Sequence, residues 1–302
     1  MHGINLTGGK NDAVPETNPR IDPILGTVVH VVGTRQSRPD LADNREVVAC
    51  PFCVGGREAP EPYDTRWFVN RWPSMSDDRC EVILYSPEHE ASFASLGVDG
   101  VVRVIELWVE RTEALGARSD VDFVLVFENR GASIGATISH PHGQIYAYDH
   151  VPQRSARLLG PNGWVPSSDE RLVVTRNDTM VAAVPHVPVY PVAVTIAPTR
   201  RVGRLGELDD AARRDLAGIL VDVLGRLDRL YGEPIPYMLW VNQRPFTAGF
   251  DEAWLNIEIV SPWRAARLPR YIAAAEVGAG EYFNPVVPEE LAVRLSNFGE
   301  PA

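Results

Sequence analysis

"VILYSPEHEASFASLGVDG" at residues 82–100 and "VTIAPTRRVGRLGELDDAA" at residues 194–212 follow the same plan. Each starts with an apolar run of strand length, passes a proline and a polar stretch, and leads into an amphipathic segment. Those segments, 98–116 and 209–231, repeat apolar residues every three or four positions, which predicts helices that bury one face. We therefore interpret the chain as an internal duplication of one strand–helix–strand unit.

The strands that follow the two helices extend this correspondence. "DFVLVFENR" follows the first helix and "YMLWVNQRP" follows the second. Beyond them "TISHPHGQI" stands opposite "AWLNIEIVS", so that His140 and His142 correspond to Asn256 and Glu258. A fold that merely needed polar groups there would accept either set. The asymmetry predicts that one copy holds the reactive side chains and that the other copy supports it.

The strand candidates are short and are separated by many prolines and glycines, as is usual for strands joined by turns. They are the segments 27–33, 66–70, 81–86, 122–128, 143–148, 171–175, 180–184, 191–197, 236–242 and 253–260.

Composition narrows the class of protein. The chain has 302 residues, of which 45% are hydrophobic and 23% charged, enough for two units of about 150 residues or one larger two-layer domain. With a formal net charge of −11 it lacks the general basic surface that nucleic acid requires, so nucleic acid is not an expected partner. No apolar run approaches the roughly 20 residues that span a bilayer, and the N-terminus does not have the order of a signal peptide. We expect a cytoplasmic protein without membrane contact.

Cysteine usage indicates a metal or redox site rather than disulfides. Cys50 and Cys53 form a C-x-x-C pair, which in a reducing compartment is a redox pair or half of a zinc site. His140 and His142 point to one face of an extended strand, so one can complete a metal site while the other does separate work. His89, just after a strand, is the best remaining histidine for the fourth ligand. A reduced cysteine pair beside a surface histidine is the alternative.

A neutral histidine can also be a nucleophile towards phosphorus. If one ring nitrogen donates to a carbonyl, the tautomer is fixed and the lone pair of the other nitrogen can attack an α-phosphorus. His142 suits this role because Gln144 places an amide donor on the same strand face. Gly131, Gly135 and Thr137 precede it in a stretch able to turn N–H and hydroxyl groups towards a phosphate. A hydrogen-bonded histidine pair in a partly buried sheet is the alternative.

Residues 127–147, "FENRGASIGATISHPHGQIYA", resemble the active-site segment of galactose-1-phosphate uridylyltransferases and their relatives, the transferase branch of the histidine-triad superfamily. Further segments agree with that family in order, and together they cover residues from about 20 to 297. They are "DPILGTVVHVVGTRQSRP" (22–39), "CPFCVGG" (50–56), "FVNRWPSM" (68–75), "YSPEHEASFASL" (85–96) and "AEVGAGEYFNPVVPEELAVRL" (275–295).

The resemblance implies both a metal and a reaction. A structural zinc ion would be bound by Cys50, Cys53, His89 and His140. His142 would be the nucleophile of a nucleotidyltransferase, which moves a nucleoside monophosphate between an NDP-hexose and a hexose 1-phosphate. Transfer would follow a ping-pong mechanism through a covalent nucleotidyl-histidine.

Further side chains match positions at which the family contacts its nucleotide. Gln144 would be the phosphate-facing helper of the nucleophile. Glutamine cannot transfer a proton at neutral pH, whereas hydrolytic relatives tend to have a third histidine there, so a hydrolase is disfavoured. Asn129 and Thr137 match contacts to the phosphates, and Asn70 and Trp72 match residues that flank the base and ribose.

The fold implied by the resemblance is α+β, with two tandem histidine-triad-like units, a mainly antiparallel sheet and helices packed on it. Residues 20–155 would form the N-terminal unit with the zinc site and the His-Pro-His-Gly-Gln motif, and residues 165–297 the C-terminal unit without catalytic histidines. The family is homodimeric. Arg35 and Arg38 would reach the phosphates, and Glu276 the hexose hydroxyls, from the second subunit.

A second structural metal, present in some uridylyltransferases, is not expected. Its ligands are histidines and a glutamate, and the corresponding residues here are Leu158, Asn242, Asn256 and Glu258. We therefore expect no iron site.

Two departures leave the substrate open. Arg71 stands where some relatives have an acidic residue near the nucleoside, and Ala275 where some have a tyrosine near the sugar. The alternative function is that of an NDP-sugar phosphorylase, similar to ADP-glucose phosphorylase, with inorganic phosphate as acceptor. A third hypothesis, from another class, is a non-catalytic nucleotide-binding module stabilised by zinc.

Overall fold

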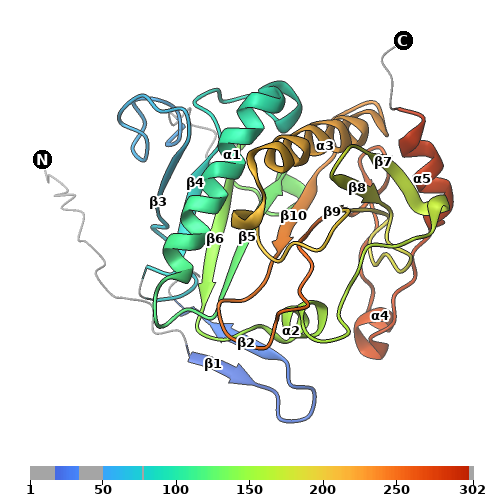
Figure 1. Cartoon of the computed structure of the whole chain (residues 1–302), viewed down its shortest axis with the longest axis horizontal. Helices are drawn as coiled ribbons and strands as arrows, with labels where there is room; N and C mark the ends of the chain where they lie inside the picture. The colour runs from blue at the N-terminus through green and yellow to red at the C-terminus, as the bar shows by residue number, and fades with distance from the viewer. Residues whose placement is uncertain (1–17, 34–49, 77, 299–302) are drawn as a thin grey trace, which may run out of the picture.

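A nine-stranded antiparallel sheet dominates the computed structural model, which describes residues 18–33, 50–76 and 78–298 (Figure 1). Two long helices, α1 (Phe93–Gly116) and α3 (Asp210–Arg229), lie beside each other across one face of the sheet. The expected α+β class with helices packed on a mainly antiparallel sheet is confirmed. Within these residues, no helix has the length and apolar character needed to cross a membrane.

Nine of the ten predicted strands make up this sheet, with ends that differ from the prediction by at most three residues. In their order across the sheet they are β3 (Arg66–Val69), β4 (Cys80–Leu84), β6 (His142–Tyr148), β5 (Phe123–Arg130), β10 (Tyr237–Asn242), β11 (Asn256–Ser261), β9 (Val192–Pro198), β8 (Met180–Ala183) and β7 (Val173–Arg176). The tenth, β2 (Val28–Val31), pairs with β1 (Asn18–Ile21) in a separate hairpin.

The order of the strands repeats in reverse about the centre of the sheet. β4, β6 and β5 on one side correspond to β9, β11 and β10 on the other, and the halves join where β5 pairs with β10. The register agrees when Pro87 is aligned with Pro198: Leu84, three residues before the first proline, faces His142 of β6, and Thr195, three residues before the second, faces Glu258 of β11. The duplication is therefore confirmed, and Glu258 occupies the place in its half that His142 occupies in the other.

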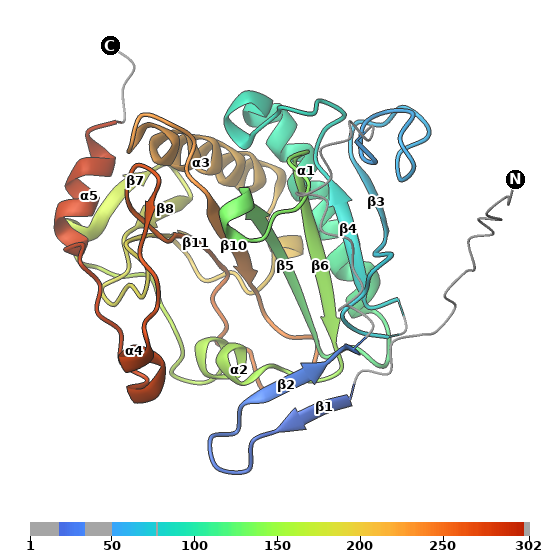
Figure 2. The same ribbon diagram turned by 180° about the vertical axis from the view of Figure 1, so that it is seen from behind.

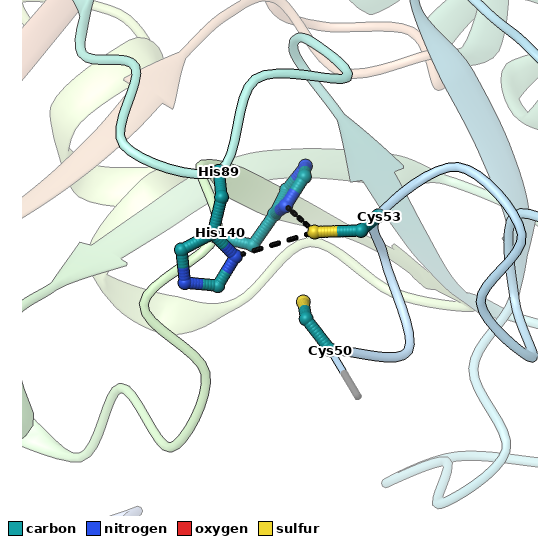
Figure 3. Close-up of side chains that lie close together, drawn as sticks. All are labelled: Cys50, Cys53, His89 and His140. Atoms are coloured by element: carbon teal, nitrogen blue, oxygen red, sulfur yellow. Dashed lines mark hydrogen bonds between the residues drawn. The ribbon is translucent and has the colours of Figure 1, made fainter. Parts of the chain in front are cut away.

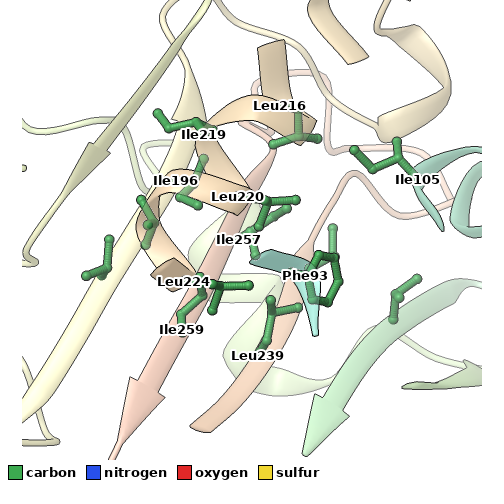
Figure 4. Close-up of a cluster of buried hydrophobic side chains, with 14 of the residues drawn as sticks. Phe93, Ile105, Ile196, Leu216, Ile219, Leu220, Leu224, Leu239, Ile257 and Ile259 are labelled. Atoms are coloured by element: carbon green, nitrogen blue, oxygen red, sulfur yellow. The ribbon is translucent and has the colours of Figure 1, made fainter. Parts of the chain in front are cut away.

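One hydrophobic core lies between the helices and the sheet and runs through both halves. Figure 4 shows the part beneath α3, where Leu220 and Leu224 lie over Leu239, Ile257 and Ile259 of the central strands. Each such side chain is almost completely buried, which contributes about 1.5–3 kcal/mol to folding. The two units share this interior, and the boundaries between them stay a prediction.

The starts of the two long helices differ in how well the sequence predicts them. Helix α3 begins as expected, because the Asp209 side chain accepts from the Ala212 N–H at 2.8 Å. Helix α1 begins five residues before the predicted position, where Ser92 and Ser95 cap each other reciprocally. The prediction was wrong because Gly97, with φ of 63°, interrupts the apolar pattern with a kink that glycine adopts without strain.

Several short elements were not predicted, because each has too few residues to show a period. They are α2 (Gln153–Leu159), α4 (Ala274–Ala279), α5 (Pro288–Ser296), strands β1, β12 (Trp263–Ala265) and β13 (Leu268–Pro269), and the 3-10 turns Ala132–Ile134, Glu170–Leu172 and Leu205–Glu207.

The sheet face opposite the long helices is the face that Figure 2 presents, with β6, β5 and β10 in view. Along β6, Gly143, Ile145 and Ala147 are buried on the helix side, whereas His142 and Gln144 point to this second face. The fold therefore places the two motif side chains together, away from the helices.

Candidate active site

Two cysteines and two histidines meet near the ends of β4 and β6 (Figure 3). Cys50 and Cys53 come from the loop before β3, His89 from the loop between β4 and α1, and His140 lies two residues before the start of β6. Their ligand atoms all lie within 4.8 Å of one another. Two thiols and two imidazoles are a common donor set for tetrahedral zinc, so this cluster can hold a metal ion. The predicted grouping of these four residues is confirmed.

Hydrogen bonds outside the cluster select the nitrogen that each histidine presents to it. In His140, Nε2 lies 2.8 Å from the Ser86 carbonyl oxygen, so Nε2–H donates there and Nδ1, 3.6 Å from Cys53 Sγ, keeps its lone pair. In His89, Nε2 lies 3.2 Å from Ser139 Oγ and Nδ1 lies 3.4 Å from the same sulfur. Such outer contacts fix ring orientation and tautomer in metal sites, and here both Nδ1 atoms face inward.

The electrostatics of the cluster suit a cation. Burial lowers the pKa of His140, which keeps the imidazole neutral and able to act as a ligand. Burial also raises the pKa of the Cys53 thiol, and the neighbouring Cys50 adds to the shift. A thiol in this setting becomes a thiolate when a cation compensates its charge. The Tyr63 hydroxyl, 3.0 Å from Nε2 of His140, has a pKa raised to about 12, mainly by burial, and so stays a hydrogen-bond donor.

His142 has the geometry of a nucleophile. Its Nδ1 lies 2.7 Å from the carbonyl oxygen of His140, so Nδ1–H donates and Nε2 keeps the lone pair. The ring of Phe52 meets the imidazole edge-on, with 5.1 Å between ring centroids. Because Phe52 lies between the two cysteines of the cluster, the loop that carries them also packs against His142.

Gln144 lies on the same strand face and is oriented by two residues of the turn after β3. Asn70 Nδ2 donates to Gln144 Oε1 at 3.1 Å, while Asn70 Oδ1 accepts from the backbone N–H of Trp72 at 2.9 Å. With its carbonyl oxygen engaged, Gln144 has its N–H₂ group left to donate. The structure therefore brings together three of the residues that the sequence singled out.

Comparisons with known proteins decide the family. Sequence models of the galactose-1-phosphate uridyl transferase N-terminal and C-terminal domains match residues 72–152 and 138–295. The Streptomyces lividans galactose-1-phosphate uridylyltransferase is 36% identical over 93% of this chain and 87% of its own length. The enzyme of that name from Thermotoga maritima is 31% identical over 91% and 96%. This chain belongs to the galactose-1-phosphate uridyl transferase family.

Two further proteins are similar to this chain over most of its length. An ADP-glucose phosphorylase from Arabidopsis thaliana is 25% identical over 96% of both chains. A solved uridylyltransferase structure superposes with a TM-score of 0.80 at 26% identity, over 93% of this chain and 98% of that one. The architecture of the uridyl transferase family is therefore present over nearly the whole length of this member.

Two more residues that match uridyl transferase contacts lie near the motif. Asn129 is on β5, on the face to which Phe127 points, and Phe127 pairs with Gln144 of β6. Thr137 lies in the segment between the Ala132–Ile134 turn and β6. Their contacts to phosphate stay predictions.

Glu276, one of the residues expected from a second subunit, does not lie beside His142 within the described part of the chain. Glu276 lies in α4, and this helix is well apart from β6 in both views of the molecule (Figures 1 and 2). Only 4% exposed, its carboxylate is engaged by Arg270 and by the backbone N–H groups of Ala273 and Phe283. The predicted contact residues Arg35 and Arg38 lie outside the described residues.

Sequence reasoning missed two residues that hold the site together. Phe52 has a weak signal, an aromatic residue between two cysteines, and it packs on both His140 and His142. The Tyr63 hydroxyl donates to the Phe52 carbonyl oxygen at 2.7 Å and lies 3.0 Å from the Ser86 carbonyl. Its role has no sequence signal, because these partners are brought to it only by folding.

Proposed function

We propose that this chain transfers a nucleoside monophosphate between an NDP-hexose and a hexose 1-phosphate, with Nε2 of His142 as the nucleophile. The single observation that supports it best is the 2.7 Å contact between Nδ1 of His142 and the His140 carbonyl, beside the Gln144 amide. Membership of the galactose-1-phosphate uridyl transferase family supports the same reaction class.

The proposed reaction has two displacements. The lone pair of Nε2 attacks the α-phosphorus, an N–P bond forms, and the bond from phosphorus to the bridging oxygen breaks, so the hexose 1-phosphate leaves with the electron pair. A phosphate oxygen of the acceptor then attacks the same phosphorus and displaces Nε2. The His140 carbonyl stabilises the positive charge that develops on the imidazolium, and the Gln144 N–H₂ group donates to a non-bridging oxygen.

The Cys50, Cys53, His89 and His140 cluster would hold a zinc ion. Zinc would supply a structural crosslink between the loop before β3 and the strand that begins at His142. The donor set and the inward-facing Nδ1 atoms fit this ion. We assign it no step in the transfer.

Covalent labelling tests the proposal. Wild-type protein incubated with UDP-glucose or ADP-glucose labelled in the α-phosphate should acquire an acid-labile, base-stable label. His142→Gly should acquire none while keeping its metal and its fold. A non-catalytic nucleotide-binding module would bind the same nucleotides without a label in either protein, and that result would reject the transferase.

The second candidate is a phosphorylase, for which the acceptor is inorganic phosphate. The resemblance to the Arabidopsis ADP-glucose phosphorylase and the cation Arg71 near the expected nucleoside position favour it. Adding galactose 1-phosphate or inorganic phosphate to the labelled protein distinguishes the two. The acceptor that removes the label, and the nucleotide product, identify the activity.

We also propose a cytoplasmic homodimer. The three cysteines are free thiols, which suits a reducing compartment. Among the exposed large apolar side chains are Ile24 and Leu25 in the β1–β2 hairpin, at 90% and 74%, and Tyr271 and Phe283 around α4, at 80% and 69%. Such exposure is typical of interaction surfaces. A monomeric mass in light scattering at micromolar concentration would reject the dimer.

A further inference from the structure

The helix side of β6, directly behind the motif, holds a buried polar group that the reaction above does not use. Glu128 of β5 is 5% exposed and lies beside Tyr85 and Tyr237, at 2% and 1%. The Tyr237 hydroxyl donates to Glu128 Oε1 at 2.8 Å. The Tyr85 hydroxyl lies over Gly143, so close that a β-carbon on that glycine would stand 2.1 Å from it.

The same tyrosine segment is joined to the strand of the candidate nucleophile. The backbone N–H of Tyr85 donates to the carbonyl of Pro141 at 3.3 Å, and the carbonyl of Ser86 accepts from His140. Tyr85 therefore contacts the chain on both sides of His142. Its side chain reaches the helix face beneath the peptide that joins His142 to Gln144.

The hydroxyl of Tyr85 and the second oxygen of Glu128 are both buried and make no hydrogen bond of ordinary geometry. They are nonetheless close enough for each to affect the ionisation of the other: burial raises the pKa of both, and the buried carboxylate further raises that of Tyr85. A buried carboxyl group with an unsatisfied oxygen is costly to a folded protein. A contribution to folding stability therefore does not explain why Glu128 is buried at this position.

The other half of the molecule shows that the fold does not need these groups. In the first half Ile83 faces Gly143, and in the second Val194 faces Ile259, so Gly143 corresponds to Ile259. Phe127 faces Gln144, so the next residue, Glu128, stands beside Gly143. Leu239 faces Ile259 in the second half, and it therefore corresponds to Glu128.

Tyr85 likewise corresponds to Ile196, which faces Ile257 in the second half. All of these counterparts are buried and apolar, and Figure 4 shows Ile196, Leu239 and Ile259 packed beneath α3. Among the described residues, Glu128 and Tyr85 are thus polar in the half that holds His142 and have apolar counterparts in the other half.

We propose that Glu128 is a positioning residue: its buried carboxylate attracts the neighbouring Tyr85 hydroxyl and keeps it over Gly143, which fixes the orientation of His142 and Gln144 for transfer. This inference rests on the proposed role of His142. Tyr237 ties the carboxyl group to β10, across the seam between the halves. A rigid peptide at Gly143 matters because a displacement of about 1 Å at a reacting centre can slow a reaction about 100-fold.

Single-turnover labelling of the holoprotein tests the proposal. Glu128→Gln keeps the volume and an acceptor for Tyr237, and Tyr85→Phe removes only the hydroxyl. Both should keep metal and substrate affinity but form the nucleotidyl-histidine about 10- to 100-fold more slowly. Thr112→Val is the matched control. It removes another buried hydrogen bond between helix and sheet, to Gln243 at 3.3 Å, away from β6.

A pH profile adds a readout that a merely structural role would not change. The polar groups facing Glu128 are Tyr85, Tyr237 of β10, and Arg130 of β5, which is itself paired with Asp228 of α3. Burial raises the pKa of Glu128 to about 7. The wild-type labelling rate should fall as pH drops through that value, and Glu128→Gln should lack this dependence.

The outcomes separate the inference from the function on which it rests. If wild-type protein forms no label, the proposed function itself fails. If wild type labels and both variants label at its rate, only the positioning role is overturned. The role is equally overturned if Glu128→Gln, Tyr85→Phe and Thr112→Val slow labelling alike, in proportion to their loss of stability.

Discussion

The two halves of this molecule hold equivalent positions with different chemistry. In the first half His142 begins β6 beside the cluster of Cys50, Cys53, His89 and His140, and its Nδ1–H donates to the His140 carbonyl. In the second half Glu258 accepts from Arg154 at 2.7 Å and from Asn242 at 2.8 Å. Asn242 also donates to Asn256, the counterpart of His140, at 2.7 Å. One sheet geometry thus supports either a reactive site or a closed polar cluster, depending on a few side chains.

The largest expected effect comes from removing the nucleophile of the first half. His142→Gly should abolish labelling and transfer, because it removes the proposed nucleophile, while metal content and melting temperature stay close to wild type. Glu258→His in the second half should create no second labelled site, because the described residues of that half form no cysteine–histidine cluster and Val260 stands in the place of Gln144. A label on residue 258, found by peptide mapping, would contradict the inference that only the first half can support a reactive histidine.

The second-largest effect is expected from substituting a cysteine of the proposed metal cluster. Cys50→Ser should lose the ion and lower stability, since metal binding to a folded site contributes directly to folding free energy. Metal analysis and thermal unfolding measure both. Cys80→Ser is the control, because Cys80 is buried in β4 outside the cluster and its variant should keep the ion. Equal metal content in Cys50→Ser and wild type would contradict the assignment.

Gly143 offers a test of close packing behind the motif. Gly143→Ala should slow labelling, because the new methyl group would collide with the Tyr85 hydroxyl. Adding Tyr85→Phe removes that hydroxyl. The nearest ring carbon and the Phe127 carbonyl oxygen then each stand 3.0 Å from the new methyl group, so the double variant should recover part of the stability but not the wild-type rate. In the second half Ile259→Ala, which only leaves a cavity, should destabilise the protein without slowing labelling of the folded fraction.

The pH dependence of stability should distinguish Glu128 from its apolar counterpart Leu239. The folded pKa of about 7 lies above the ordinary value of 4.5, so between these values the folded protein keeps a proton that the unfolded chain has released. The stability from this proton is fully present below about pH 4.5 and is lost as pH rises through about 7.

Chemical denaturation at several pH values measures this loss. Relative to Glu128→Gln, wild type should lose on the order of 3 kcal/mol between about pH 4 and pH 8. A stability difference between the two proteins that is constant with pH would contradict the assignment.

The smallest effect is expected at the ion pair of the second half. Arg154→Met should lower stability by about 1 kcal/mol, because it leaves the half-buried Glu258 carboxylate unpaired while its own guanidinium is already well exposed. Labelling should be unchanged. Arg176→Met is the matched control, since Arg176 and Glu170 are both exposed and their pair should contribute almost nothing. Loss of labelling in Arg154→Met would show that the second half does more than support the first.

The spacing of residues along the sequence made many elements of the fold and several residues of the candidate site predictable. The two long helices follow from their apolar period, and the i, i+2, i+4 spacing of His140, His142 and Gln144 puts all three on one face of an extended segment. The C-x-x-C pair has metal-ligand spacing by itself. The duplication was visible because the two copies keep the same order of elements. The sequence by itself therefore determined the strands, the long helices and the chemistry of the motif.

Tertiary structure alone decided which distant groups complete the site. Tyr63 reaches Ser86 and His140, Asn70 orients Gln144, and Glu128 lies behind Gly143, although these partners are far apart in the chain. Such contacts depend on how the strands are ordered across the sheet, and local propensity does not specify that order. A buried carboxyl group beside a glycine has meaning only once the register brings them together, because its effect depends on distance and burial.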